Sequence, residues 1–145
     1  GQAQEPKPLI SRDRIKLNLT GAELIIAAAK QKAAEIKVNV NIAVVDDGGH
    51  LLHFQRLDGA AAISSHIAPA KAHTAAMGRR ESKVYEDIIN GGRYSFLSVP
   101  NLQGMLEGGV PIMKDGQCLG AVGVSGVKST EDAQIAKAGI GAIGL

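Results

Sequence analysis

Two β-hairpins with glycine at their corners constrain the fold of this 145-residue chain more than any other feature. Each joins two apolar runs through Asp-Gly or Gly-Gly, where the backbone needs positive φ and glycine adopts it at the lowest cost. Alternation along the second run of the first hairpin predicts that Leu52 and Phe54 share one face of a sheet. The paired runs are 38–46 with 50–56 and 110–113 with 117–124.

Helical periodicity fills much of the remaining chain. Thr20 and Glu23 match a capping box at the start of an amphipathic segment that continues to about residue 37. Ser129 is the predicted cap of the last helix, with Asp132 at its third position. The other predicted elements are helices over 64–77, with Pro69 in the first turn or at a kink, and over 82–89, and a short strand or loop over 93–99.

This order of elements predicts an α/β protein of the α+β type. A helix, a hairpin, two helices, a second hairpin and a last helix form an antiparallel sheet flanked by helices, not a doubly wound parallel sheet. The length and the mass of 15.0 kDa favour one domain. We place that domain at 17–145, behind an extended N-terminal arm at 1–16.

Composition argues against several classes of protein. The net charge is +2, the basic residues are scattered, and aromatic residues make up only 3% of the chain. A nucleic-acid-binding surface needs a basic stripe, usually with aromatic platforms, so no nucleic-acid partner is predicted. No apolar run approaches the roughly 20 residues of a membrane span. Cys118 is the only cysteine, which excludes an internal disulfide, and its apolar strand favours an inert buried thiol.

The N-terminal residues bear on location. Residues 1–8, GQAQEPKP, lack an initiator Met and form a polar tail containing proline. Such a tail remains after a signal peptide is cut at small residues, which predicts an exported or periplasmic protein. An artificial chain boundary looks the same, so a cytoplasmic location stays open.

Six stretches of the chain resemble the GlcG/HbpS-like family, which includes the C-terminal domain of PduO-type proteins. They occur in the family's order and cover much of the region between residues 43 and 139. Lys71 and His73 lie in one of them, and Gly108-Gly109 lies in another. The stretches are 43–51 (AVVDDGGHL), 56–60 (RLDGA), 70–75 (AKAHTA), 108–112 (GGVPI), 120–126 (GAVGVSG) and 131–139 (EDAQIAKAG).

This resemblance implies a profilin-like fold with an antiparallel sheet, and assembly into dimers that build octamers. It also implies a link to haem or a related tetrapyrrole, as a binding protein, a sensor partner or a degrading protein. Some haem-binding members are thought to use a histidine on the first helix as a ligand, and this chain has none between residues 19 and 37. Its histidines are His50, His53, His66 and His73.

Two of these histidines are candidate haem or metal ligands. His66 and His73 lie seven residues apart, two turns along one face of a continuous helix. A neutral imidazole is a good ligand for haem iron. The two rings would lie roughly 10 Å apart by helical rise, too far to share one metal. The alternative is that one histidine is solvated and the other is hydrogen-bonded to the backbone.

A second group of candidates suits a carboxylate ligand such as a haem propionate or an organic acid. Lys71 and Thr74 share a helix face, and Arg79 follows nearby. The alternative is a solvated helix face with Thr74 bonded back to the helix.

Acidic and glycine-rich turns supply the last candidates. Asp46 can act as an acid–base group or stabilise its turn, and Arg56 can anchor an acid or pin the same corner. Gly108-Gly109 allows the backbone to approach a ligand closely, or simply forms a tight loop entry.

Three functions follow from these candidates. In the first, a small-ligand-binding protein holds haem or a tetrapyrrole in a cavity between the Lys71 helix and the sheet. Lys71, Arg79 or Arg56 would then anchor the acids, and His66 or His73 would approach the iron. In the second, a cofactor-independent enzyme polarises the carbonyl group of a small organic acid with Lys71, Thr74 and Asp46 and with amides near Gly108-Gly109. In the third, the protein is an oligomeric accessory or scaffold.

Overall fold

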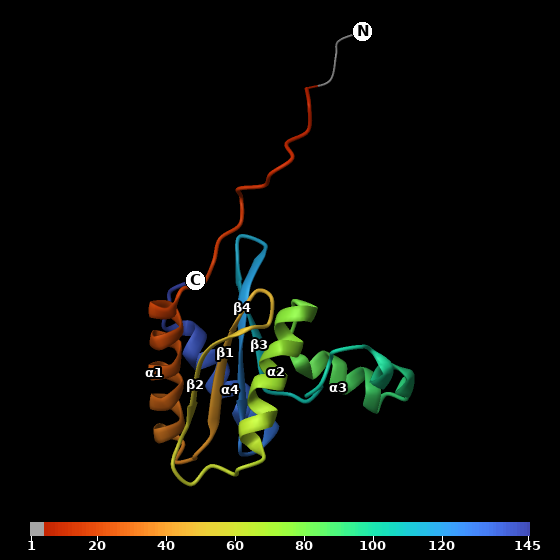
Figure 1. Ribbon diagram of the computed structural model, residues 1–145. Coiled ribbons are helices and arrows are strands. Elements are labelled where there is room, and N and C mark those ends of the chain that lie inside the picture. The colour runs from red at the N-terminus through yellow and green to blue at the C-terminus, as the bar shows by residue number, and fades with distance from the viewer. Residues whose placement is uncertain (1–4) are drawn as a thin grey trace.

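In the computed structural model, which describes residues 5–145, a four-stranded antiparallel sheet lies between helices on both faces (Figure 1). The strand order is β2-β1-β4-β3, so the two hairpins meet through the central strands β1 and β4. The elements are α1 Leu19–Glu35, β1 Asn41–Asp46, β2 Leu51–Arg56, α2 Ser64–Gly78, α3 Ser82–Asn90, the 3₁₀ helix η1 Tyr94–Ser98, β3 Gly109–Lys114, β4 Gln117–Ser125 and α4 Ser129–Gly141. The α+β architecture predicted from the hairpins is confirmed.

Helices α1 and α4 cover one face of the sheet with branched aliphatic side chains. Ile25 from α1 and Ile135 from α4 are fully buried against residues such as Ile42 of β1. Burying one such side chain contributes about 1.5–3 kcal/mol, so this larger cluster supplies most of the apolar burial. Figure 1 shows α1 and α4 on the side of the sheet opposite α2.

Helix α2 covers the other face and packs with its backbone unusually close to the strands. The contact is made by small residues, with Ala72 and Ala75 of α2 against Ala43 and Ala121 of the sheet. A Cβ atom on Gly123 of β4 would lie 2.0 Å from the carbonyl oxygen of Ala68. Only glycine leaves room for a helix at this distance.

Helix α3, η1 and the following segment project sideways from the body of the molecule (Figure 1). This projecting arm spans residues 82–107 and returns to the sheet at Gly109. Ser82 anchors its base, because the Ser82 hydroxyl donates to the Leu106 carbonyl and accepts the Gly109 N–H at 2.8 Å. Tyr85 and Phe96 stack within it, with ring centroids 5.3 Å apart.

The prediction that Leu52 and Phe54 share one face of the sheet is wrong, because a β-bulge interrupts the first hairpin. The pairing of β1 with β2 shifts between Val44 and Val45. An extra residue in one strand reverses the alternation of side chains beyond it. Leu52 therefore packs against the α1–α4 cluster, whereas Phe54 packs against the α2 cluster.

The predicted helix caps are also wrong in detail. Asn18, not Thr20, caps α1, and its side chain accepts the Gly21 N–H at 2.9 Å. Ser129 lies inside α4, whose N-cap residue Lys128 makes no side-chain cap bond. Pro69 is the sixth residue of α2, and so lies beyond the first turn.

Two segments that the sequence left uncertain are also defined. Residues 94–98 form a 3₁₀ helix, where a strand or loop was predicted. Of the predicted arm at 1–16, residues 1–4 lie outside the described part of the chain. Residues 5–16 contain no helix or strand.

Over residues 5–145, the helices are too short or too polar to cross a membrane.

The close approach of α2 predicts a large effect from one added methyl group. Gly123→Ala should lower the free energy of unfolding by about 3 kcal/mol, because its Cβ would overlap the Ala68 carbonyl and push α2 off the sheet. Gly141→Ala is the matched control, since a Cβ there meets nothing within 4 Å. Urea unfolding followed by circular dichroism measures both, and equal stability of the two variants would contradict this packing.

Candidate functional site

Lys71 enters the interior of the protein instead of facing a ligand. Its side chain is buried and runs past the end of β4 toward the opposite face of the sheet. The Nζ atom donates to the Val124 carbonyl at 3.0 Å and to the Asp132 carboxylate of α4 at 3.1 Å. Lys71 and Asp132 are only 2% and 1% exposed, so the two residues form a buried ion pair that joins α2 to α4.

Gly108 and Gly109 make room for this ion pair and for α2. A Cβ atom on Gly108 would lie 2.7 Å from the Lys71 Nζ, and one on Gly109 would lie 2.2 Å from the Lys71 carbonyl oxygen. Gly108 also has a φ of 134°, a backbone conformation that other residues rarely adopt. The close backbone approach predicted at this Gly-Gly pair therefore serves the protein's own lysine.

The environment of Asp132 favours its neutral form more than solvent does. Burial raises the pKa of the Asp132 carboxyl above its ordinary value. The Lys71 ammonium and the backbone N–H groups of Val127 and Gly126 oppose this rise without cancelling it.

The expected cavity between the Lys71 helix and the sheet is absent from the described structure, and its predicted location is wrong. Small side chains and glycine bring α2 into direct contact with the strands, and the Lys71 ammonium is engaged on the far side. Thr74 is also buried, and its hydroxyl donates to the Gln103 carbonyl. Lys71 and Thr74 therefore do not meet at an exposed ligand site.

Asp46 stabilises the β1–β2 turn. One carboxylate oxygen accepts the backbone N–H groups of Gly48 and His50, each at 2.9 Å, and lies 3.2 Å from the His50 imidazole Nδ1. Burial alone would raise the pKa of Asp46, but these contacts outweigh it and hold the pKa below its ordinary value. This is the turn role that the sequence offered as the alternative to acid–base chemistry.

The two arginines of the predicted site also lie apart. Arg79 ends α2 in the left-handed region, with φ 57°, and its Nη1 donates to the carbonyls of Asp47 and Ala76 at 2.7 and 2.8 Å. Arg56 is exposed at the end of β2. The proposed catalytic set of Lys71, Thr74 and Asp46 is likewise not brought together.

Two hollows of the described structure involve the projecting arm: one lies between α2 and the arm, and the other lies within the arm. The groove nearest the body of the protein has a volume of about 490 Å³ and a mainly apolar lining. We call it the His73 groove. It is lined by His73, Met77, Gly78, Tyr85, Val99, Pro100, Asn101 and Leu102.

His73 is the one predicted ligand that this groove contains. Its Nδ1 lies 3.3 Å from the Gly49 carbonyl oxygen, which can only accept, so Nδ1 carries the proton and Nε2 is the free ring nitrogen. Gly49 is required there, because a Cβ at its position would lie 2.4 Å from Nδ1. His66 is exposed and does not line this groove.

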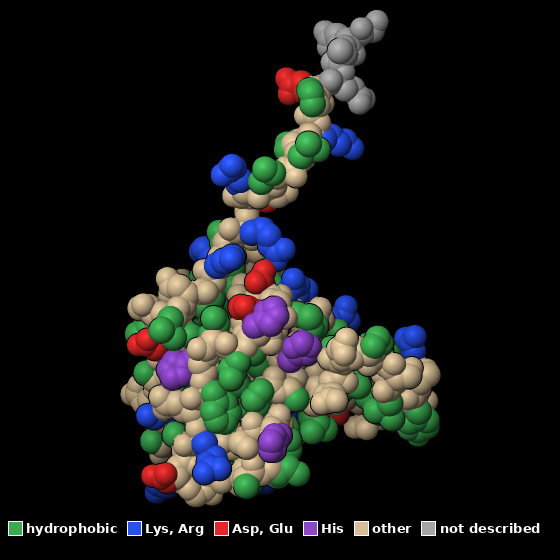
Figure 2. Space-filling view, viewed as in Figure 1, with side chains coloured by type: hydrophobic (Ala, Val, Ile, Leu, Met, Phe, Trp, Pro, Cys, Tyr) green, Lys and Arg blue, Asp and Glu red, His purple; other side chains and the backbone are tan. Residues whose placement is uncertain are grey.

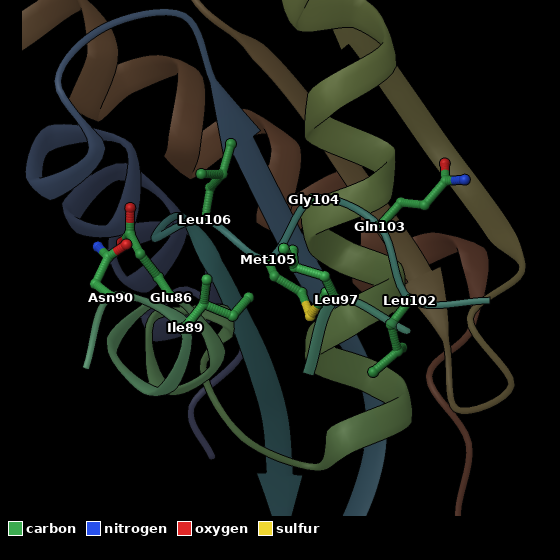
Figure 3. A pocket seen from close by; sticks show the side chains of 9 residues that line it. All are labelled: Glu86, Ile89, Asn90, Leu97, Leu102, Gln103, Gly104, Met105 and Leu106. Carbon is green, nitrogen blue, oxygen red and sulfur yellow. The ribbon is translucent and has the colours of Figure 1, made fainter. Parts of the chain in front are cut away.

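A second hollow lies farther out along the arm and has a volume of about 350 Å³. Figure 3 shows Glu86 and Asn90 of α3 on one side of it and the side chains of Leu97 and Met105 directed toward its centre. The Glu86 carboxylate accepts the Glu107 N–H at 3.1 Å and so helps to shape the arm.

The part of the chain that the structure describes shows no metal site built from several protein side chains. Residues 5–145 contain no group of three or more histidine, cysteine, aspartate or glutamate side chains arranged to hold a metal ion. Figure 2 shows the histidines spread over one face of the molecule, not gathered at one point.

Sequence reasoning missed most of the groove's lining. Met77 and Tyr85 were not singled out, although Met77 follows His73 at the i,i+4 spacing that places both on one helix face. Arg80 was also missed, and its guanidinium lies 5.9 Å from the centre of the Tyr85 ring at the groove.

The buried ion pair predicts a pH-dependent loss of stability. Lys71→Met should lower the free energy of unfolding by about 3–5 kcal/mol near neutral pH, because Asp132 loses its buried partner. A carboxyl whose pKa is raised in the folded state contributes stability at low pH and loses it as pH rises through that pKa. Removing Lys71 raises the pKa of Asp132 further, so the deficit should shrink as Asp132 becomes protonated in acid.

Urea unfolding at neutral and acid pH measures this difference. The double variant Lys71→Met/Asp132→Leu is the control, because it leaves no buried charge and should regain much of the lost stability. A deficit that grows in acid would contradict the assignment.

Comparison with known proteins identifies a family and relatives of this chain. Residues 17–141 match the family described as "haem degrading protein HbpS-like". Protein GlcG of Escherichia coli K12 is 49% identical over 114 residues, which cover 79% of this chain and 84% of GlcG.

Solved structures share the fold. A double mutant of HbpS from Streptomyces reticuli superposes with a TM-score of 0.82 at 27% identity, covering 98% of this chain and 100% of that one. A structure of a PduOC:heme complex superposes with a TM-score of 0.78 at 29% identity, covering 90% and 96%. The resemblance found in the sequence is confirmed, and this chain belongs to the HbpS-like family.

Proposed function

We propose that this protein binds haem or a closely related tetrapyrrole in the His73 groove, with the His73 Nε2 as the ligand to iron. The observation that carries the proposal is the pairing of His73 Nδ1 with the Gly49 carbonyl beside an apolar groove. Iron-binding histidines characteristically donate their other ring nitrogen to a backbone carbonyl or carboxylate, which fixes the ring and its tautomer. Membership of a family described as haem degrading, and a fold shared with the PduOC:heme complex, support it.

The groove fits a flat, apolar ligand with acidic groups at one edge. Its volume of about 490 Å³ lies within the range of small-molecule sites, and its walls are mainly apolar. Met77 is 39% exposed at its mouth, and its flexible, polarisable side chain offers an apolar contact for the ligand. Arg80, packed over Tyr85, is the cation best placed to anchor an acidic edge.

The residues of this chain have separate roles in the proposal. Bound haem would supply the redox chemistry of its iron. His73 binds the iron, Tyr85 and Leu102 exclude water from the apolar faces, and Arg80 orients the ligand. Lys71 serves the same site indirectly, because its ion pair fixes α2 against the rest of the protein.

A homo-oligomer is part of the same proposal. Large apolar side chains remain exposed on the projecting arm, with Tyr94 at 68%, Leu97 at 63% and Leu106 at 43%. A second copy packed on this arm would cover these side chains and close the His73 groove from outside. This is consistent with the octamers that the family resemblance implies.

A haem titration with two histidine variants tests the proposal. The wild-type Soret band is expected to sharpen, shift and saturate at one equivalent of hemin. His73→Ala should weaken binding by about tenfold or more and lose the histidine-ligated spectrum. His66→Ala removes an exposed imidazole from the same helix and should bind as the wild type does. Equal spectra for the two variants would refute His73 as the ligand, and a featureless wild-type titration would refute haem binding.

A further inference from the structure

The turn between β1 and β2 contacts His73 and is itself held by contacts with two other parts of the chain. Gly49 of this turn presents its carbonyl to the His73 Nδ1, so the position of the turn sets the position of the imidazole. Inside the turn, the Asp46 carboxylate satisfies two backbone N–H groups and keeps the loop in one conformation. Two residues outside the turn also hold it in place: Arg79 and, on the N-terminal arm, Arg14. We call these two contacts the clamps.

Arg79 connects the turn to the helix that carries His73. Its Nη1 donates to the carbonyls of Asp47 and Ala76, so one guanidinium nitrogen links the turn to the last part of α2. Hydrogen bonds from a charged donor are stronger than those from a neutral one. Arg79 therefore holds the distance between the turn and α2, which is the distance that the His73–Gly49 contact spans.

The N-terminal arm contacts the same turn through Asp47, and its Arg14 lines one hollow together with Arg79. Arg14 forms an ion pair with the Asp47 carboxylate at 2.5 Å. The arm is itself attached to β4 by the Gln117 side chain, which accepts the Ile15 N–H at 3.1 Å and donates to the Asp13 carbonyl at 2.8 Å. Figure 1 shows the arm reaching the body of the protein beside the tip of the β3–β4 hairpin.

We infer that Arg79, assisted by Arg14 of the N-terminal arm, is a positioning residue that holds the β1–β2 turn against His73 and so keeps the imidazole in the orientation and tautomer needed to bind iron. This inference rests on the proposed function for its role in ligand binding. The contacts that carry it lie outside the His73 groove. Docking or release of the N-terminal arm is thereby coupled to the ligand site through Asp47 and Gly49.

The tautomer of His73 gives a readout that is independent of haem. In the wild-type protein, ¹⁵N chemical shifts recorded at a pH where the ring is neutral should show His73 protonated at Nδ1 alone. Arg79→Ala should give a mixture of both tautomers and weaken hemin binding by about tenfold, the effect expected from losing a charged donor at a partly buried contact. Arg79→Lys should restore a single tautomer, because an ammonium can donate to the same two carbonyls.

Variants of the N-terminal arm test the contact between Arg14 and Asp47. Arg14→Ala should weaken hemin binding by about two- to threefold, because its ion pair with Asp47 is largely exposed. Arg12→Ala is the matched control on the same arm and should behave as the wild type does. Thermal unfolding of every variant confirms that each one is folded before its spectra are compared.

The outcomes separate this inference from the proposed function. A folded Arg79→Ala protein with one His73 tautomer and wild-type hemin affinity would overturn the inference and leave the haem proposal intact. If the wild type binds no hemin, the haem proposal fails, and the tautomer measurement still decides whether Arg79 positions His73. A mixed tautomer in Arg79→Ala, with recovery in Arg79→Lys, would support the clamp.

Discussion

The direct packing of α2 on the sheet is the constraint on which the rest of this structure depends. Gly123 and Gly109 remove the side chains that would separate the helix from the strands, and alanines fill the contact. A helix seated this closely leaves no interior space for a ligand between itself and the strands. The outer side of α2 and the projecting arm then supply the concave surfaces on which the proposed site is built.

The buried Lys71–Asp132 pair completes this arrangement. It connects helices on opposite faces of the sheet at the end where the Gly108 backbone leaves room for an ammonium group. A buried ion pair adds little net stability compared with an apolar contact, but losing one partner is costly. The pair is therefore best understood as a device that specifies how α2 and α4 are placed. That placement carries His73 to the Gly49 turn.

The fold was well predicted from the sequence because its strongest signals are local. The hairpin corners Gly48-Gly49 and Asp115-Gly116 and the helical periodicities each lie within a few residues, and the sheet follows from them. The site was predicted less well because its contacts join distant segments. Lys71 with Asp132 and His73 with Gly49 are separated by 61 and 24 residues. The roles of Lys71 and Gly108 could therefore not be separated from ligand binding by spacing alone.

A chemical-shift map with a diamagnetic porphyrin tests the central claim most directly. Amide spectra of the protein would be recorded with and without gallium protoporphyrin, which binds without broadening nearby signals. The account predicts that the shifts gather at 73–85 and 99–102, the two walls of the His73 groove, and leave Ala43 and Ala121 beneath α2 unchanged. Shifts centred on those buried alanines, or no shifts at all, would contradict it.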